Sequence, residues 1–202
     1  MAAQRRIGTE TSKTRDALLD AVERLMLRDG YAAVTYRVVA AEAGVTSGLV
    51  QYYFPALDQV FLAAIRRRSA QNLERLTAAL RARPDTPLRV LWEYSRDEAT
   101  AALTTEFLAL GNHRKSIRSE IALVSEQVRA VQLDALTNRT PHDRESCAGL
   151  TPGGLLFLLT GVPKLVRLEE GIGMTAAHRD ALEFVEQYLD LVEPRNGDRA
   201  IR

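Results

Sequence analysis

One short segment of the chain, AGVTSGLVQYYF at positions 43–54, concentrates side chains that form hydrogen bonds without carrying a charge. Its hydroxyl and amide groups come from Thr46, Ser47, Gln51, Tyr52 and Tyr53. Hydroxyls and amides of this kind bind phosphate oxygens and the edges of bases, and a glutamine amide can both donate and accept. The segment therefore has the chemistry of a recognition surface.

Two short helices joined by a tight turn would position these side chains. The first is expected to begin after Thr35 and to stop before Gly44, and the second to begin after Thr46 and to stop at Pro55. This arrangement is typical of a helix-turn-helix. The local pattern also leaves open a plain helix-loop-helix corner of an all-α protein, with half-buried tyrosines.

The start of the second helix carries two further signals. Val45 and Val50 have the spacing of a hydrophobic staple, which fixes the direction in which the chain enters the helix, and Phe54 is expected to face inward. Gly48 falls in the first turn, where glycine costs about 1 kcal/mol relative to alanine. A close approach to a DNA phosphate or base edge would offset that cost, and the free amides of a helix N-terminus suit such a ligand.

The rest of the chain also has helical periodicity. Apolar residues recur on one face of the first segment, which Thr11 or Ser12 is expected to cap, and a run without Gly or Pro extends from Leu57 to about Arg83. Further helices are expected at about 87–110 with a break near Asp97, 113–138, 152–171 and 175–193. The polar, turn-rich stretch 138–149 predicts a loop. No segment alternates convincingly as a strand, so the predicted fold class is all-α.

The first 65 or so residues resemble the N-terminal DNA-binding domain of the tetracycline-repressor (TetR) family of bacterial transcription regulators. The features that carry the resemblance are Gly30-Tyr31, Thr35, the stretch from Ala40 to Val45, Gly48 and the pair Tyr53-Phe54. The resemblance implies a three-helix helix-turn-helix domain at 1–56, joined by a long helix to a helical ligand-binding and dimerisation domain at 57–202. It implies that the third helix enters the major groove of double-stranded DNA.

Carried over position by position, the resemblance implies DNA contacts from Thr35, Tyr36, Arg37, Thr46, Ser47, Gly48, Gln51, Tyr52 and Tyr53. Two departures limit it: many relatives have a tyrosine at Gln51, and the family usually places a phosphate-binding lysine at Leu57. A basic arm comprising Arg5, Arg6, Lys13 and Arg15 is a candidate substitute for that lysine, although a solvated tail explains it equally well.

The last two predicted helices have wide apolar surfaces. On the first of these helices, one stripe is formed by Leu155, Leu159, Val162 and Val166. On the last helix, one stripe is formed by Leu182, Val185, Leu189 and Val192. A second stripe on the last helix comprises Phe184, Tyr188 and Leu191, so this helix needs apolar partners on two sides. The resemblance implies a homodimer with a four-helix interface. This interface is assigned to the first stripe of each helix, which means Leu155, Leu159, Val162, Val166, Leu182, Val185 and Leu189. A helix fully buried within a monomer is the alternative.

The resemblance also implies a pocket among the middle helices for a small, mostly apolar effector. Polar and aromatic residues interrupt their apolar surfaces, and the candidate contacts are Trp92, Tyr94, Thr104, Phe107 and His113. Each has a structural alternative: Trp92 and Phe107 as core, His113 as a helix-end residue. Glu106 also interrupts the apolar surface of these helices, and its structural alternative is a solvent-exposed position. The implied function is a ligand-responsive, sequence-specific transcription regulator, a repressor acting as a homodimer on a pseudo-palindromic operator.

Composition excludes other classes of protein. The 202 residues are 46% hydrophobic and 26% charged, which is typical of a globular protein. The net charge is +1, so the overall charge does not indicate a polyanionic partner. No apolar run is long enough to span a membrane and no signal peptide is visible, which predicts a cytoplasmic protein. The single Cys147 forms no intrachain disulfide.

Enzyme and cofactor motifs are missing from the sequence. The three histidines lack metal-ligand spacing, and there is no phosphate-binding glycine loop or serine nucleophile motif, so neither catalysis nor a cofactor nor a metal is expected. Two alternatives stay open: a helical enzyme whose carboxylates converge only in three dimensions, and an adaptor that uses its tyrosines to contact another protein.

Overall fold

The computed structural model describes residues 2–138 and 150–194, with side chains for 13–98, 100–138 and 150–194. The predicted loop at 138–149 falls almost entirely outside the described residues, and so does Cys147. Within the described ranges all regular structure is helical, which confirms the all-α prediction. No helix there is long and apolar enough to cross a membrane.

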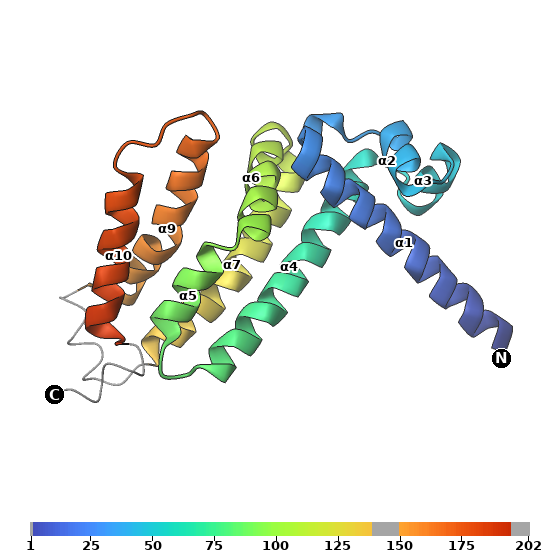
Figure 1. The fold of residues 1–202 in the computed structure, drawn as a ribbon. Coiled ribbons are helices and arrows are strands. Elements are labelled where there is room, and N and C mark those ends of the chain that lie inside the picture. The colour runs from blue at the N-terminus through green and yellow to red at the C-terminus, as the bar shows by residue number, and fades with distance from the viewer. Residues whose placement is uncertain (1, 139–149, 195–202) are drawn as a thin grey trace. The chain divides into compact units, whose positions relative to one another are not determined.

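Figure 1 shows the helices of the described residues. In chain order they are α1 (Ala2–Asp29), the 3₁₀ turn η1 (Tyr31–Ala33), α2 (Tyr36–Ala43), α3 (Ser47–Tyr53), α4 (Leu57–Ala82), α5 (Pro87–Ser95), α6 (Glu98–His113), α7 (Lys115–Thr137), α9 (Pro152–Glu170) and α10 (His178–Val192). The predicted boundaries agree closely except at the start, because α1 begins at Ala2 and the predicted cap at Thr11 or Ser12 is therefore wrong. The predicted break is present, and there Asp97 accepts the Thr100 amide at 2.8 Å.

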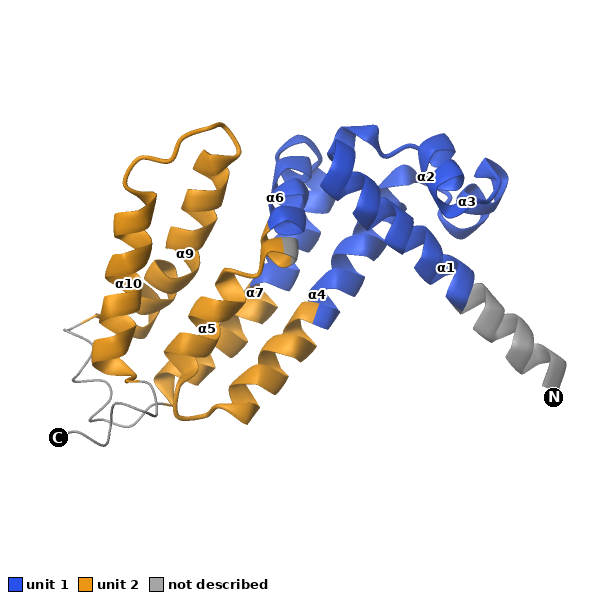
Figure 2. Ribbon diagram, in the orientation of Figure 1, with its two compact units in different colours: residues 1–71, 102–125 blue, residues 72–101, 126–202 orange. Residues whose placement is uncertain are grey.

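The chain forms two compact units (Figure 2). Unit 1 comprises residues 1–71 and 102–125, and unit 2 comprises residues 72–101 and 126–202. The helices α4, α6 and α7 each contribute residues to both units.

Unit 1 is built around the apolar face of α1. The predicted stripe is fully buried there, as Leu18, Val22, Leu25 and Met26. They join a single core with apolar side chains from α2, α3, α4, α6 and α7: Val39, Ala40, Val50, Phe54, Val60, Phe61, Leu103, Phe107, Leu110 and Ile117. This core holds α2 and α3 against α1 and α4.

Unit 2 has its own core and an unusual helix cap. Thr86 precedes α5 without capping it through its side chain. Instead the carboxylate of Glu193, just after α10, accepts the amides of Leu88 and Arg89 at 3.0 Å each. The Arg89 guanidinium returns a bond of 2.6 Å to the backbone oxygen of Glu193. The end of α10 therefore caps the start of α5, about a hundred residues earlier in the chain.

Candidate nucleic-acid interface

The turn between α2 and α3 has the geometry that the sequence predicts. Thr35 caps α2 by accepting the Val38 amide at 3.3 Å, and Thr46 caps α3 by accepting the Leu49 amide at 3.3 Å. Gly44 ends α2 in the left-handed conformation with φ of 67°, which glycine adopts without a steric penalty. Both predicted caps and the helix-turn-helix are confirmed.

One face of α3 is buried and the other is open to solvent. Val50 and Phe54, four residues apart, lie in the core of unit 1. Gln51 and Tyr52 point outward, and Tyr52 is 76% exposed. A helix turns about 100° per residue, so Ser47 lies above Gln51 on this outer face. The outer face therefore presents hydroxyl and amide groups and no charge.

Gly48 lies on the same outer face. A Cβ atom added at this position would meet no atom within 4 Å. Its backbone angle φ is also not in the left-handed region, so packing and conformation within the chain do not require glycine here. Any requirement for glycine must come from a surface that approaches the helix from outside.

The nine predicted contact residues differ in exposure. Thr35, Arg37, Thr46, Gly48, Gln51 and Tyr52 are exposed, and Tyr36, Ser47 and Tyr53 are half-buried. The hydroxyl of Tyr36 donates to the backbone oxygen of Phe54 at 2.9 Å, and burial raises the pKa of this phenol. Tyr36 therefore ties the start of α2 to the end of α3, a positioning role that sequence alone did not suggest.

Leu57 and the basic arm considered as a substitute for the missing lysine can both be located in the structure. Leu57, the first residue of α4, is half-buried and packs against the unit 1 core. Lys13 and Arg15 are exposed on α1, whereas the side chains of Arg5 and Arg6 lie outside the described residues. The Arg15 guanidinium lies over the Phe54 ring at 5.3 Å, within cation–π range.

A carboxylate from α6 holds the corner between α1 and α2. Glu106 accepts the backbone amide of Tyr31 at 2.8 Å, and the ring of His113 stacks on the ring of Tyr31 at 6.1 Å between centroids. The sequence predicts His113 as an effector contact and Glu106 as a polar interruption, and it does not reveal their shared partner because Tyr31 lies 75 or more residues away. Both contact the chain segment that leads into the helix-turn-helix.

Two ion pairs fix α4 to α7 and to the corner between α6 and α7. Asp58 accepts hydrogen bonds from the Ser116 hydroxyl and the Arg114 guanidinium, which lower the pKa of this carboxyl. Arg66 makes a bidentate pair with Glu120 at 2.8 and 2.7 Å, which lowers the pKa of Glu120. The first half of α4, which follows the recognition helix directly, is thereby held at two points.

The predicted effector contacts fall in both units. Trp92 lies in the core of unit 2 and Phe107 lies in the core of unit 1. A core position is the structural alternative that the sequence left open for both residues. Thr104 is half-buried and His113 is exposed in unit 1. Tyr94, in unit 2, donates from its hydroxyl to the backbone oxygen of Asn72 at 3.4 Å.

Asn72 is a candidate that the sequence did not single out. It is 8% exposed, and its side-chain oxygen has no hydrogen-bond partner among the described residues. A buried acceptor left without a donor costs about 1–3 kcal/mol. Nothing in the local sequence distinguishes this asparagine from a solvated one, because its burial arises from tertiary packing.

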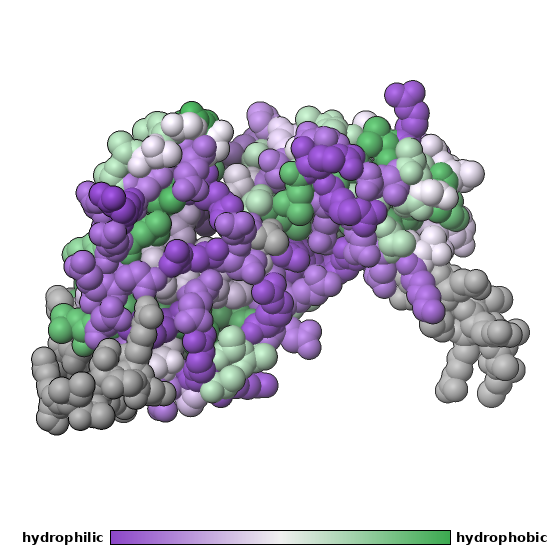
Figure 3. Space-filling view, viewed as in Figure 1, coloured by the Kyte–Doolittle hydropathy of each residue, from purple (hydrophilic) through white to green (hydrophobic). Residues whose placement is uncertain are grey.

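The predicted dimer residues lie in the interior of unit 2. Its core contains Leu155, Leu159, Val185 and Leu189; Val166 is buried as well, while Val162 and Leu182 pack against the core half-buried. The outward side chains of these helices are instead Phe157, Leu165 and Leu168 on α9, and Phe184 and Leu191 on α10. Figure 3 shows apolar surface along these helices. Phe184 and Leu191, at 61% and 77% exposed, belong to the second stripe of α10, so in the single chain the exposed stripe is the one that the sequence analysis did not assign to the dimer interface.

Chemistry other than binding has little support in this geometry. No group of three His, Cys, Asp or Glu side chains in the described part of the chain is placed to hold a metal ion. The polar groups on α2 and α3 form caps and an exposed row, which suits hydrogen bonding to an external partner.

Comparison with known proteins places this helix-turn-helix in a family. The profile described as "Bacterial regulatory proteins, tetR family" matches residues 18–64. A transcriptional repressor of Brucella suis, BepR, is 27% identical over 140 residues, which are 65% of this chain and 65% of BepR. The regulator BetI of Rhizobium meliloti is 28% identical over 131 residues, covering 65% of this chain and 60% of BetI.

The match thus spans less than two thirds of the length of either relative. Among solved structures, the multidrug-binding protein EbrR in complex with imidazole is 28% identical with a TM-score of 0.58. That similarity covers 87% of this chain and 89% of EbrR, and so extends well beyond the helix-turn-helix. Residues 18–64 therefore form a helix-turn-helix region that matches the bacterial regulatory proteins of the tetR family.

Proposed function

We propose that this protein is a transcription regulator that binds a specific operator in double-stranded DNA and represses the adjacent genes. The observation that carries the proposal is the outer face of α3, where Ser47, Gly48, Gln51 and Tyr52 stand opposite the buried Val50. A helix with a capped, open N-terminus and a row of uncharged donors and acceptors fits the major groove. The relatives BepR and BetI are named as a repressor and a regulator.

In this proposal eight of the nine predicted residues from Thr35 to Tyr53 contact DNA. Thr35, Arg37, Thr46, Ser47, Tyr52 and Tyr53 bind phosphates, Gln51 reads a base, and Gly48 allows close approach. Tyr36 acts by positioning, because its hydroxyl already bonds the backbone at Phe54. A protein bound to a bacterial chromosome acts in the cytoplasm.

The protein acts as a homodimer in this proposal, through the outward apolar side chains of α9 and α10. Five large apolar residues are exposed there: Phe157, Leu165, Leu168, Phe184 and Leu191. An exposed apolar surface of this kind marks an interaction site. A two-fold dimer presents two recognition helices, so the operator is a pseudo-palindrome with half-sites about one helical turn apart, or a multiple of that.

A small, mostly apolar effector is the proposed signal, with Tyr94 and Asn72 as its most defined contacts. The unpaired side-chain oxygen of Asn72 lies in the interior of unit 2 and calls for a hydrogen-bond donor. The relative EbrR has been solved with ethidium and with malachite green, both aromatic compounds. Trp92, also in unit 2, is a further proposed contact, whereas the predicted contacts Thr104, Phe107 and His113 lie in unit 1 and are not assigned to this site.

Selection of binding sites from random double-stranded DNA tests the proposal. We expect a two-fold symmetric consensus and an affinity that falls steeply with salt, because phosphate contacts release counterions. Arg37→Gln should lower the salt dependence, whereas Arg179→Gln, which removes an equal charge from an exposed site on α10, should not. Failure to enrich any sequence, with equal weak binding to all DNA, would refute the proposed function.

A further inference from the structure

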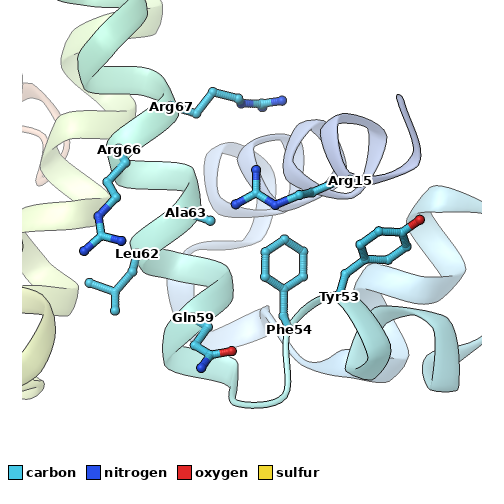
Figure 4. Close-up of a pocket in the computed structure, with 8 residues that line it drawn as sticks. All are labelled: Arg15, Tyr53, Phe54, Gln59, Leu62, Ala63, Arg66 and Arg67. Atoms are coloured by element: carbon cyan, nitrogen blue, oxygen red, sulfur yellow. The ribbon is translucent and has the colours of Figure 1, made fainter. Parts of the chain in front are cut away.

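A solvent-open cavity of about 640 Å³ lies in unit 1, among residues of α1, the end of α3 and the first half of α4 (Figure 4). Its wall includes Tyr53, a proposed DNA contact, and Arg15, which belongs to the basic arm considered above as a candidate DNA contact. The proposed function gives the cavity itself no role, since none of the proposed effector contacts lines it.

The wall of the cavity carries positive charge. Arg15, Arg66 and Arg67 line it, and no acidic residue does. Arg66 and Arg67 are paired with Glu120 and Glu23, which stand outside the wall. Arg15 makes no ion pair with any residue that the structure describes, and in Figure 4 its guanidinium extends into the space between α1 and α4. Arg15 therefore leaves an uncompensated guanidinium directed into the cavity.

The rest of the wall is amphipathic. Phe54, Leu62 and Ala63 form apolar surface beside the arginines, and the Phe54 ring lies under the Arg15 guanidinium at 5.3 Å. Gln59 adds an amide from the first turns of α4. A ligand suited to this wall has one anionic group for the guanidinium fork and an apolar body for the aromatic and aliphatic side.

We propose that this cavity is a binding site for a small amphipathic organic anion, a carboxylate, sulfonate or phosphate ester. Its anionic group pairs with the Arg15 guanidinium, and its apolar part contacts Phe54 and Ala63. A phosphate of the DNA backbone has the same charge, but it brings no apolar group to the apolar side of the wall. The observations therefore favour a free small molecule.

Calorimetric titration of the full chain, free of DNA, tests the site with naphthalene-1-sulfonate as the probe. Naphthalene-1-methanol, which keeps the ring without the charge, is the matched neutral compound. We expect the sulfonate to bind about tenfold more tightly than the alcohol, as one charge-assisted contact implies. Arg15→Gln should remove that preference and Arg15→Lys should restore part of it. Arg81→Gln, which removes an equal charge from an exposed site on α4, should leave the preference unchanged.

Two results would overturn the proposal. One is equal affinity of the wild-type protein for the charged and the neutral probe, and the other is an unchanged sulfonate affinity in Arg15→Gln. If Arg15→Gln instead weakens operator binding and reduces its salt dependence while probe binding stays the same, then Arg15 is a DNA phosphate ligand. The titration uses no DNA, so its outcome does not depend on the proposed function.

Discussion

Replacing Glu193 by alanine tests how much this side chain, which joins the end of α10 to the start of α5, contributes to the free energy of unfolding. The carboxylate is 4% exposed and accepts the amides of Leu88 and Arg89 at 3.0 Å each. A hydrogen bond to a charged group contributes about 1.5–3 kcal/mol, and alanine leaves two amides unpaired at a helix N-terminus. We therefore expect the free energy of unfolding to fall by about 3 kcal/mol. For a chain of this size that corresponds to a fall of about 6–12 °C in melting temperature.

Thermal and urea unfolding followed by circular dichroism, at matched protein concentration, measure this loss. Glu193→Gln keeps one acceptor oxygen but turns an amide group toward the second N–H, so we expect roughly half the effect. Glu183→Ala on α10 is the matched control, because that side chain is 61% exposed, and it should change stability by no more than about 0.5 kcal/mol. A Glu193→Ala protein that unfolds like the Glu183→Ala protein would show that the cap at α5 contributes little.

Three further predictions concern recognition, assembly and pH. Gln51→Ala should cost about 1–3 kcal/mol per half-site and relax the preference at one symmetric position; an unaltered consensus in site selection would refute that role. Phe184→Glu should give a folded monomer in sedimentation, because the side chain is 61% exposed in the single chain; a persistent dimer would exclude this surface. The lowered pKa of Asp58, caused by Ser116 and Arg114, stabilises the fold at neutral pH and is lost as the pH falls through the folded-state pKa. Asp58→Asn should therefore be less stable than wild type at pH 7, and in urea titrations the difference should shrink as the pH falls below about 4 and vanish only below the lower folded-state pKa.

The sequence predicts local features of this protein well. The caps Thr35 and Thr46, the turn at Gly44 and the inward Phe54 depend on residues at most four positions apart, and all are present. The start of α1 is the exception. Thr11 resembles a cap, but the helix continues through it to Ala2, because a capping residue is compatible with a helix interior when the backbone goes on.

Sequence patterns do not predict contacts between residues that are far apart in the chain. Glu106 and Glu193 each accept backbone amides from partners 75 or more residues away, and an isolated glutamate gives no sign of such a partner. For a related reason, the sequence does not show which stripe on α10 is exposed in the single chain. Val185 and Phe184 are neighbours of similar hydrophobicity, and only the packing of α9 and α5 decides which of them is buried.

At position 48, the stability of the fold and the proposed binding of DNA favour different residues. Alanine fits there without touching any atom of the chain, and in a helix it should stabilise the fold by about 0.5–1 kcal/mol. In the proposed complex, the same methyl group would stand between the helix backbone and DNA. Screens that rank variants by thermal stability would therefore favour Gly48→Ala while selecting against repression, and only a screen that also scores operator occupancy would retain the glycine.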